Sequence, residues 1–102
     1  MKHAVKLDPA ALADLRTLRA YDRRAVIDMI ERVLTTTPTQ VSKSRIKRLR
    51  GLDSPQYRLR VGDVRVMYDV IGSDVYVLRV LSKAAVGEYL REMGHEIEDS
   101  DG

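Results

Sequence analysis

Three arginines, Arg58, Arg60 and Arg65, lie close together in the stretch YRLRVGDVRVMYDV, residues 57–70. A guanidinium stays charged at every physiological pH and can bind two phosphate oxygens at once. In a strand, residues two apart project from the same face about 7 Å apart, so Arg58 and Arg60 are expected to point together. This arrangement predicts either a phosphate-binding surface or a solvated sheet face.

The dipeptide Gly62–Asp63 between the two apolar runs is a signal for a two-residue hairpin turn. With the simplest register, Val61 pairs with Val64 and Arg60 faces Arg65. Like charges placed directly opposite each other reduce stability. Such a pair is retained more readily when an anion lies between the two groups, which favours the phosphate-binding interpretation.

The charge of the chain is unevenly distributed. Residues 43 to 65 hold eight basic residues and two acidic ones, a net charge of +6, whereas the whole chain carries +3. The rest of the chain therefore sums to −3. Such asymmetry suggests a polyanionic partner, although a solvated basic face is the alternative.

Other kinds of active site are disfavoured. His3 and His95 lie at opposite ends of the sequence, and the chain has no cysteine. No glycine-rich phosphate loop, nucleophile elbow or zinc-ligand spacing is present. We therefore expect neither a metal nor a cofactor.

Length and composition indicate one soluble globular domain. The chain has 102 residues, of which 44% are apolar and 32% charged. No apolar run approaches the roughly 18 residues of a membrane helix. The N-terminus has no apolar signal-peptide core, so we expect a cytoplasmic protein with no membrane partner.

The first half of the chain predicts a strand and two helices. HAVKL (3–7) alternates like a strand, and Asp8–Pro9 is a typical helix start. A first helix is expected to about Arg19, and a second from near Asp22 until TTTPT (35–39). The joint between them is expected around Tyr21, which predicts a helical hairpin.

The second half predicts a basic linker, three strands and a last helix. The linker spans residues 41–54, and QYRLRV, VRVMYDV and VYVLRVL read as strands. The first two strands are predicted to have an apolar and a polar face, and the third is predicted to be central because it is apolar on both. Apolar residues at helical spacing in KAAVGEYLREMG predict a short C-terminal helix.

These elements predict an α+β fold. An N-terminal strand and a helical hairpin would pack on a mostly antiparallel four-stranded sheet with a short C-terminal helix. Residues 1–94 would form the domain, and the acidic residues 95–102 are expected to be a frayed tail.

The segments LRGLDSPQYRLRVGDVRVMYDV and VYVLRVLSKAAVGEY resemble the RelE/ParE superfamily of toxins from toxin–antitoxin systems. The resemblance is closest to the RelE-type messenger-RNA interferases. It covers nearly the whole chain, because the order of elements is also that of the family, and its most diagnostic part is the hairpin.

The resemblance implies a ribosome-dependent endoribonuclease that cuts mRNA without a metal. The 2′-hydroxyl of the RNA attacks the adjacent phosphate and leaves a 2′,3′-cyclic phosphate. The positions that match the family's catalytic residues are Arg58, Arg60, Arg65, Lys83 and Tyr89. A surrounding basic segment would dock RNA without sequence choice, through Lys43, Arg45, Lys47, Arg48 and Arg50.

The chain departs from the family at the proton acceptor. Arg58 and Arg60 stand where the family has lysines, and an arginine is a poor general base. Tyr89 could position the nucleophile or transfer a proton, or it could simply pack. Lys83 could serve the leaving 5′-oxygen. The group that accepts the proton of the 2′-hydroxyl therefore stays unassigned. Tyr57 and Tyr68 fall on the apolar strand face and are expected in the core.

The resemblance also implies partners. They are a cognate antitoxin, the ribosome and mRNA, with DNA contacted only indirectly through the antitoxin complex. Two other functions remain open. One is a ParE-like DNA gyrase poison on the same scaffold, and the other is a non-catalytic module that binds RNA or a partner.

Overall fold

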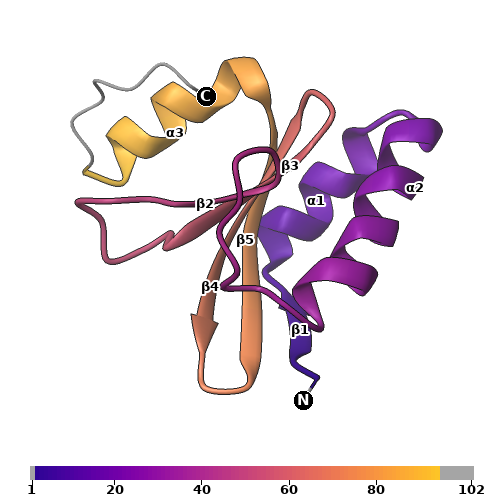
Figure 1. The fold of residues 1–102 in the computed structure, drawn as a ribbon. Coiled ribbons are helices and arrows are strands. Elements are labelled where there is room, and N and C mark those ends of the chain that lie inside the picture. The colour runs from indigo at the N-terminus through magenta and orange to yellow at the C-terminus, as the bar shows by residue number, and fades with distance from the viewer. Residues whose placement is uncertain (1, 95–102) are drawn as a thin grey trace.

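The computed structural model describes residues 2–94 and has an α+β architecture (Figure 1). Two helices cover one face of a five-stranded sheet, and a third helix lies on the other side (Figure 1). The elements in chain order are β1 (Ala4–Leu7), α1 (Pro9–Thr17), α2 (Ala20–Met29), a π-helical turn (Ile30–Leu34), β2 (Ile46–Arg48), β3 (Tyr57–Val61), β4 (Val64–Ile71), β5 (Asp74–Ser82), a 3₁₀ turn (Lys83–Ala85) and α3 (Val86–Glu92).

The strands are ordered β1-β5-β4-β3-β2 across the sheet. β1 pairs in parallel with β5, and the other neighbours are antiparallel. The predicted class is confirmed, and β5 is indeed an interior strand. The expected count of four strands is wrong, because part of the basic linker forms β2. Ile46 explains this strand, since its side chain is buried in the core beside Leu59.

The helical hairpin is confirmed, but its joint lies at Leu18 and Arg19 rather than at Tyr21. Asp8 caps α1 by accepting a hydrogen bond from the backbone N–H of Ala10 at 3.0 Å. At the other end, the Arg23 guanidinium donates to the carbonyl oxygens of Leu15 (3.2 Å) and Leu18 (2.9 Å). These bonds satisfy the last carbonyls of α1 and allow α2 to begin at Ala20.

The threonines after α2 end the helical segment, as their positions predict. The hydroxyl of Thr36 donates to the carbonyl oxygen of Arg32 at 2.8 Å, and that of Thr37 donates to Val33 at 3.5 Å. The Val33 carbonyl oxygen also accepts the backbone N–H groups of Thr37 (2.8 Å) and Thr36 (3.2 Å), so the threonines close the last turn through both side chain and backbone.

The central hairpin has the predicted register, with Val61 opposite Val64 and Arg60 opposite Arg65. Gly62 has a φ of 60° in this turn. Glycine adopts this left-handed conformation readily because it has no Cβ atom, whereas other residues adopt it rarely. The predicted apolar face is also confirmed, since Val64 and Val66 are buried against the helices. The opposite face of β4 is not solvated, because Arg65 and Met67 are buried there.

Hydrophobic residues form two clusters, one on each face of the sheet. The larger cluster joins the sheet to α1, α2 and the π-helical turn. The smaller one joins it to α3 and consists of Leu49, Met67, Leu81, Val86 and Leu90. We call the two sides of the sheet the hairpin face and the α3 face.

The two strand tyrosines belong to the hairpin face, as predicted. Tyr68 is fully buried, its hydroxyl donates to the carbonyl oxygen of Pro38 at 2.6 Å, and Tyr57 packs against the cluster. Their rings stack with centroids 5.5 Å apart. Burial raises the pKa of the Tyr68 phenol, with a smaller contribution from Tyr57.

The acidic segment 95–102 and His95 lie outside the described residues, so the expectation of a frayed tail stays a prediction. Within residues 2–94, no helix has both the length and the apolar character needed to span a membrane.

Candidate active site

A row of side chains crosses four adjacent strands on the α3 face. Lys47 of β2 pairs with Arg58 of β3, Arg58 with Met67 of β4, and Met67 with Arg79 of β5. Neighbouring strands lie about 5 Å apart, so each residue in this row lies beside the next. Met67 is buried and separates the basic pair Lys47 and Arg58 from Arg79.

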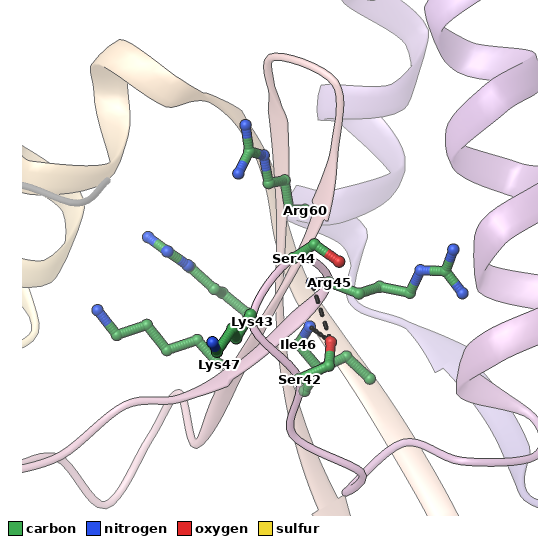
Figure 2. A pocket seen from close by; sticks show the side chains of 8 residues that line it. Ser42, Lys43, Ser44, Arg45, Ile46, Lys47 and Arg60 are labelled. Carbon is green, nitrogen blue, oxygen red and sulfur yellow. Dashed lines mark hydrogen bonds between the residues drawn. The ribbon is translucent and has the colours of Figure 1, made fainter.

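A hollow of about 280 Å³ opens beside the Lys47–Arg58 pair, and we call it the basic hollow. Five of the described residues that line it are cationic, and none is acidic. Such a concentration of positive charge favours a bound polyanion. The lining residues are Ser42, Lys43, Ser44, Arg45, Ile46, Lys47, Arg58 and Arg60 (Figure 2).

The loop that forms one wall of the hollow is ordered by Ser42. Its hydroxyl oxygen accepts hydrogen bonds from the backbone N–H groups of Arg45 (3.1 Å) and Ile46 (3.4 Å), drawn as dashed lines in Figure 2. The Arg45 side chain extends away from Lys43 and Lys47, toward the side of the purple helices (Figure 2). Arg45 therefore lies at the rim of the hollow.

The three arginines of the hairpin do not share one environment. Arg60 is exposed and Arg58 half-buried, and both line the basic hollow. Arg65 is only 2% exposed, and its Nη1 donates to the carbonyl oxygens of Gly62 (2.8 Å) and Val64 (3.2 Å). The sequence places all three on the α3 face, but it does not show that Arg65 braces the hairpin turn.

Lys83 lies near the tip of the same hairpin. It follows β5 directly, its side chain is exposed, and its backbone N–H donates to the carbonyl oxygen of Asp63 at 2.7 Å. This bond ties the end of β5 to the β3–β4 turn. Lys83 is therefore on the same end of the sheet as Arg60 and Arg65.

Tyr89 is half-buried on α3 and packs against the cluster around Met67. The Arg79 guanidinium carbon lies 5.7 Å from the centre of its ring. Burial raises the pKa of the Tyr89 phenol, while the positive charge of Arg79 opposes that rise. The Arg79 side chain thus joins Tyr89 to the row that crosses the sheet.

Arg79 is itself held by Asp14 of α1. Its Nε and Nη2 donate to the two carboxylate oxygens at 2.7 Å and 3.0 Å, and the backbone N–H of Val80 donates to Asp14 Oδ2 at 2.9 Å. The carboxylate raises the pKa of Arg79, chiefly through the hydrogen bond. One carboxylate therefore links α1, β5 and, through Arg79, the ring of Tyr89.

A β-bulge explains why Arg79 reaches the α3 face. Met67 pairs with Arg79 but Tyr68 pairs with Val77, so Leu78 is the extra residue. With strict alternation, Arg79 would share the face of Val77 and enter the core. Arg79 is not among the residues that the sequence pointed to, although it is the single charged residue within the apolar stretch VYVLRVL.

The basic segment 43–50 does not form one continuous surface. β2 alternates, so Lys47 lies on the α3 face whereas Arg48 lies over the ring of Tyr57, 5.0 Å from its centre. The structure therefore separates Arg48 from the basic hollow. Arg50 is exposed outside β2 and does not line it. An RNA contact of either residue stays a prediction.

Metal ligands are not grouped in the described part of the chain. Across residues 2–94, no three histidine, cysteine, aspartate or glutamate side chains are placed to hold a metal ion.

The fold is that of a toxin of the RelE/ParE superfamily. Residues 5–86 match the family described as the ParE toxin of the type II toxin–antitoxin system parDE, so the chain belongs to that family. It is also 36% identical over 84 residues to "Putative toxin RelE1" of Methanocaldococcus jannaschii, with 81% of this chain and 91% of that protein covered.

Solved structures support the same relationship. The toxin–antitoxin complex RelBE2 from Mycobacterium tuberculosis contains a chain 25% identical to this one with a TM-score of 0.70, covering 80% of this chain and 99% of that chain. The archaeal RelE–RelB complex from Pyrococcus horikoshii matches at 25% identity and a TM-score of 0.66, over 80% and 96%. A doubly substituted Escherichia coli RelE toxin in the free state shares the fold at 24% identity, with a TM-score of 0.68 over 92% and 96%.

Proposed function

We propose that this toxin is a ribosome-dependent endoribonuclease that cuts mRNA and so inhibits translation. The observation that carries the proposal is the basic hollow, in which Lys47, Arg58 and Arg60 lie together on the same face of the sheet as Tyr89. Residues 1–94 would form the catalytic domain. The similarity to proteins named RelE supports this branch of the superfamily.

In this reaction the 2′-oxygen of the RNA forms a bond to the adjacent phosphorus. The bond from phosphorus to the 5′-oxygen of the next nucleotide breaks, leaving a 2′,3′-cyclic phosphate and a 5′-hydroxyl. Extra negative charge develops on the non-bridging oxygens in the transition state. Arg58 and Arg60 would stabilise it, because fixed guanidinium groups in a partly desolvated site are effective donors to such oxygens.

Three further residues have proposed roles. Lys83, exposed at the end of β5, would neutralise or protonate the leaving 5′-oxygen. Tyr89 would position the RNA, since its ring is constrained on α3 by Arg79. Arg65 would act indirectly by holding the hairpin turn in place, because its Nη1 donates hydrogen bonds to the carbonyl oxygens of Gly62 and Val64.

The proposed partners are a cognate antitoxin, the ribosome and mRNA. An antitoxin is supported by the related chains from M. tuberculosis and P. horikoshii, which are described in complexes with one. We propose that the antitoxin covers the basic hollow, and that DNA is contacted only through the toxin–antitoxin complex.

The direct test is cleavage of mRNA on programmed ribosomes by the purified chain, read as new 5′ ends by primer extension. We expect cuts in the codon at the ribosomal A site, and no cut where the nucleotide 5′ to that bond carries a 2′-deoxy sugar. Intact mRNA after prolonged incubation would contradict the proposal.

A ParE-like poison of DNA gyrase is the second candidate, favoured by the match to the ParE toxin family. The same purified chain should be incubated with gyrase, ATP and supercoiled plasmid. Trapped gyrase–DNA cleavage complexes together with untouched mRNA would select this candidate. Expression without growth arrest, alongside tight binding to the antitoxin, would instead indicate a non-catalytic module.

A further inference from the structure

The proposed reaction needs a group that removes the proton from the 2′-hydroxyl. Most residues near the basic hollow are unsuited to this step. Arginine does not lose its proton in proteins, which excludes Arg58, Arg60 and Arg65. The described residues that line the hollow include no histidine and no carboxylate. Only the two lysines, Lys43 and Lys47, can exist as neutral amines there.

Tyr89 is also poorly placed to act as the base. Burial raises the pKa of its phenol, which disfavours the phenolate. Its ring lies over Arg79, and Met67 stands between Arg79 and Arg58 in the row across the sheet. Tyr89 therefore lies at the Arg79 end of the row, away from Arg58, where it can contact RNA as a neutral phenol.

Lys47 has the position that the step requires. It is a half-buried strand residue directly opposite Arg58, and the Cβ atoms of such cross-strand pairs lie about 5 Å apart. A phosphate bound by Arg58 would therefore be within reach of the Lys47 amine. Lys43, in contrast, is exposed in the loop before β2, where fewer contacts restrict its side chain.

We propose that Lys47 is the general base of the ribonuclease reaction. This inference rests on the function proposed above. The neutral Nζ of Lys47 takes the proton of the 2′-hydroxyl as the 2′-oxygen bonds to phosphorus and the bond to the 5′-oxygen breaks. The leaving oxygen takes its proton from Lys83 or water, and Lys47 later returns its own proton to solvent. The proton acceptor is thereby a lysine of β2, the strand next to the one that carries Arg58 and Arg60.

The test compares Lys47→Arg with the wild type in single-turnover cleavage of ribosome-bound mRNA. Arginine keeps the charge and can still bind phosphate but cannot accept the proton, so we expect a loss of about 100-fold or more in rate. Affinity for the programmed ribosome should change by less than about threefold, because the charge is kept. The matched control is Lys6→Arg on β1, at the opposite edge of the sheet, which should cleave at the wild-type rate.

Two further readouts separate a base from a structural residue. The rise of the wild-type rate with pH should disappear in Lys47→Arg. In Lys47→Ala, added primary amines should restore cleavage, and amines of higher basicity should restore it more. Circular dichroism would confirm that the variants are folded.

The outcomes distinguish the two proposals. If the wild type leaves mRNA intact, both are overturned. If the wild type cuts mRNA and Lys47→Arg cuts it equally fast, Lys47 is not the base although the proposed function stands. The inference also fails if Lys43→Arg causes the loss instead, or if the pH dependence persists and amines restore nothing.

Discussion

At the level of single residues, the basic hollow combines cations of two kinds. Arg58 and Arg60 carry a fixed positive charge, whereas Lys43 and Lys47 belong to a side-chain type that can also exchange a proton. The sequence correctly predicted that these arginines share one face of the sheet, because strand alternation and a tight turn decide which way they point. It could not identify the burial of Arg65, which depends on packing beneath the turn.

Arg60, an exposed strand residue of the hollow, should be important for catalysis. We expect Arg60→Ala to lower the single-turnover rate of mRNA cleavage by about 100-fold, since losing one fixed donor to a developing oxyanion typically has such an effect. The rate is measured at saturating toxin. Arg16→Ala, on the exposed side of α1, should leave it unchanged. Equal rates for the two variants would contradict a role of Arg60 in the transition state.

Tyr68 should make stability depend on alkaline pH. Its pKa is raised in the folded state, so the unfolded chain loses this proton first as the pH rises above about 10. The stabilising effect is complete below that pH and declines above it. Urea unfolding at pH 8 and pH 11 should show a smaller decrease in free energy of unfolding for Tyr68→Phe than for the wild type. Equal decreases would exclude Tyr68 as the cause.

At the level of elements, β2 and the bulge in β5 determine the composition of the site. β2 brings Lys47 to Arg58 and turns Arg48 to the opposite face. The bulge turns Arg79 from the core to the α3 face. Both features decide on which face of the sheet a side chain lies. They are difficult to predict from sequence, because one extra residue moves every following side chain of the strand to the opposite face.

Asp14 should stabilise the junction of α1, β5 and α3. Asp14→Ala leaves the Val80 N–H and the Arg79 guanidinium without this acceptor, so we expect the free energy of unfolding to fall by about 1–3 kcal/mol. Denaturant unfolding measures the change. Asp28→Ala, which removes an exposed ion pair with Arg32, is the matched control and should change stability by less than about 1 kcal/mol. Similar effects of the two variants would argue against the junction.

At the level of the whole molecule, five cationic residues gather at the basic hollow, while the chain outside residues 43–65 has a net charge of −3. The helices α1 and α2 cover the hairpin face of the sheet (Figure 1). The basic hollow is lined instead by β2, β3 and the loop before β2. Such a distribution would direct the proposed polyanionic substrate to this surface.

Binding of single-stranded RNA should depend strongly on salt. If each of the five lining cations neutralises one phosphate, the logarithm of affinity falls with the logarithm of salt concentration with a slope of about −3.5. Lys43→Ala should reduce the steepness by about 0.7, because one contact is lost. Fluorescence anisotropy across a salt series measures both slopes. A slope that Lys43→Ala leaves unchanged would place the RNA elsewhere.

The sequence by itself determined the fold class, the hairpin register and the face on which Arg58 and Arg60 lie. These features depend on residues close together in the chain, through alternation, capping and turn geometry. Only the tertiary structure decided that Lys47 lies beside Arg58, that Arg65 is buried and that Asp14 holds Arg79. The physical reason is that these contacts depend on strand pairing and on packing, and Asp14 meets Arg79 across 65 positions of the chain.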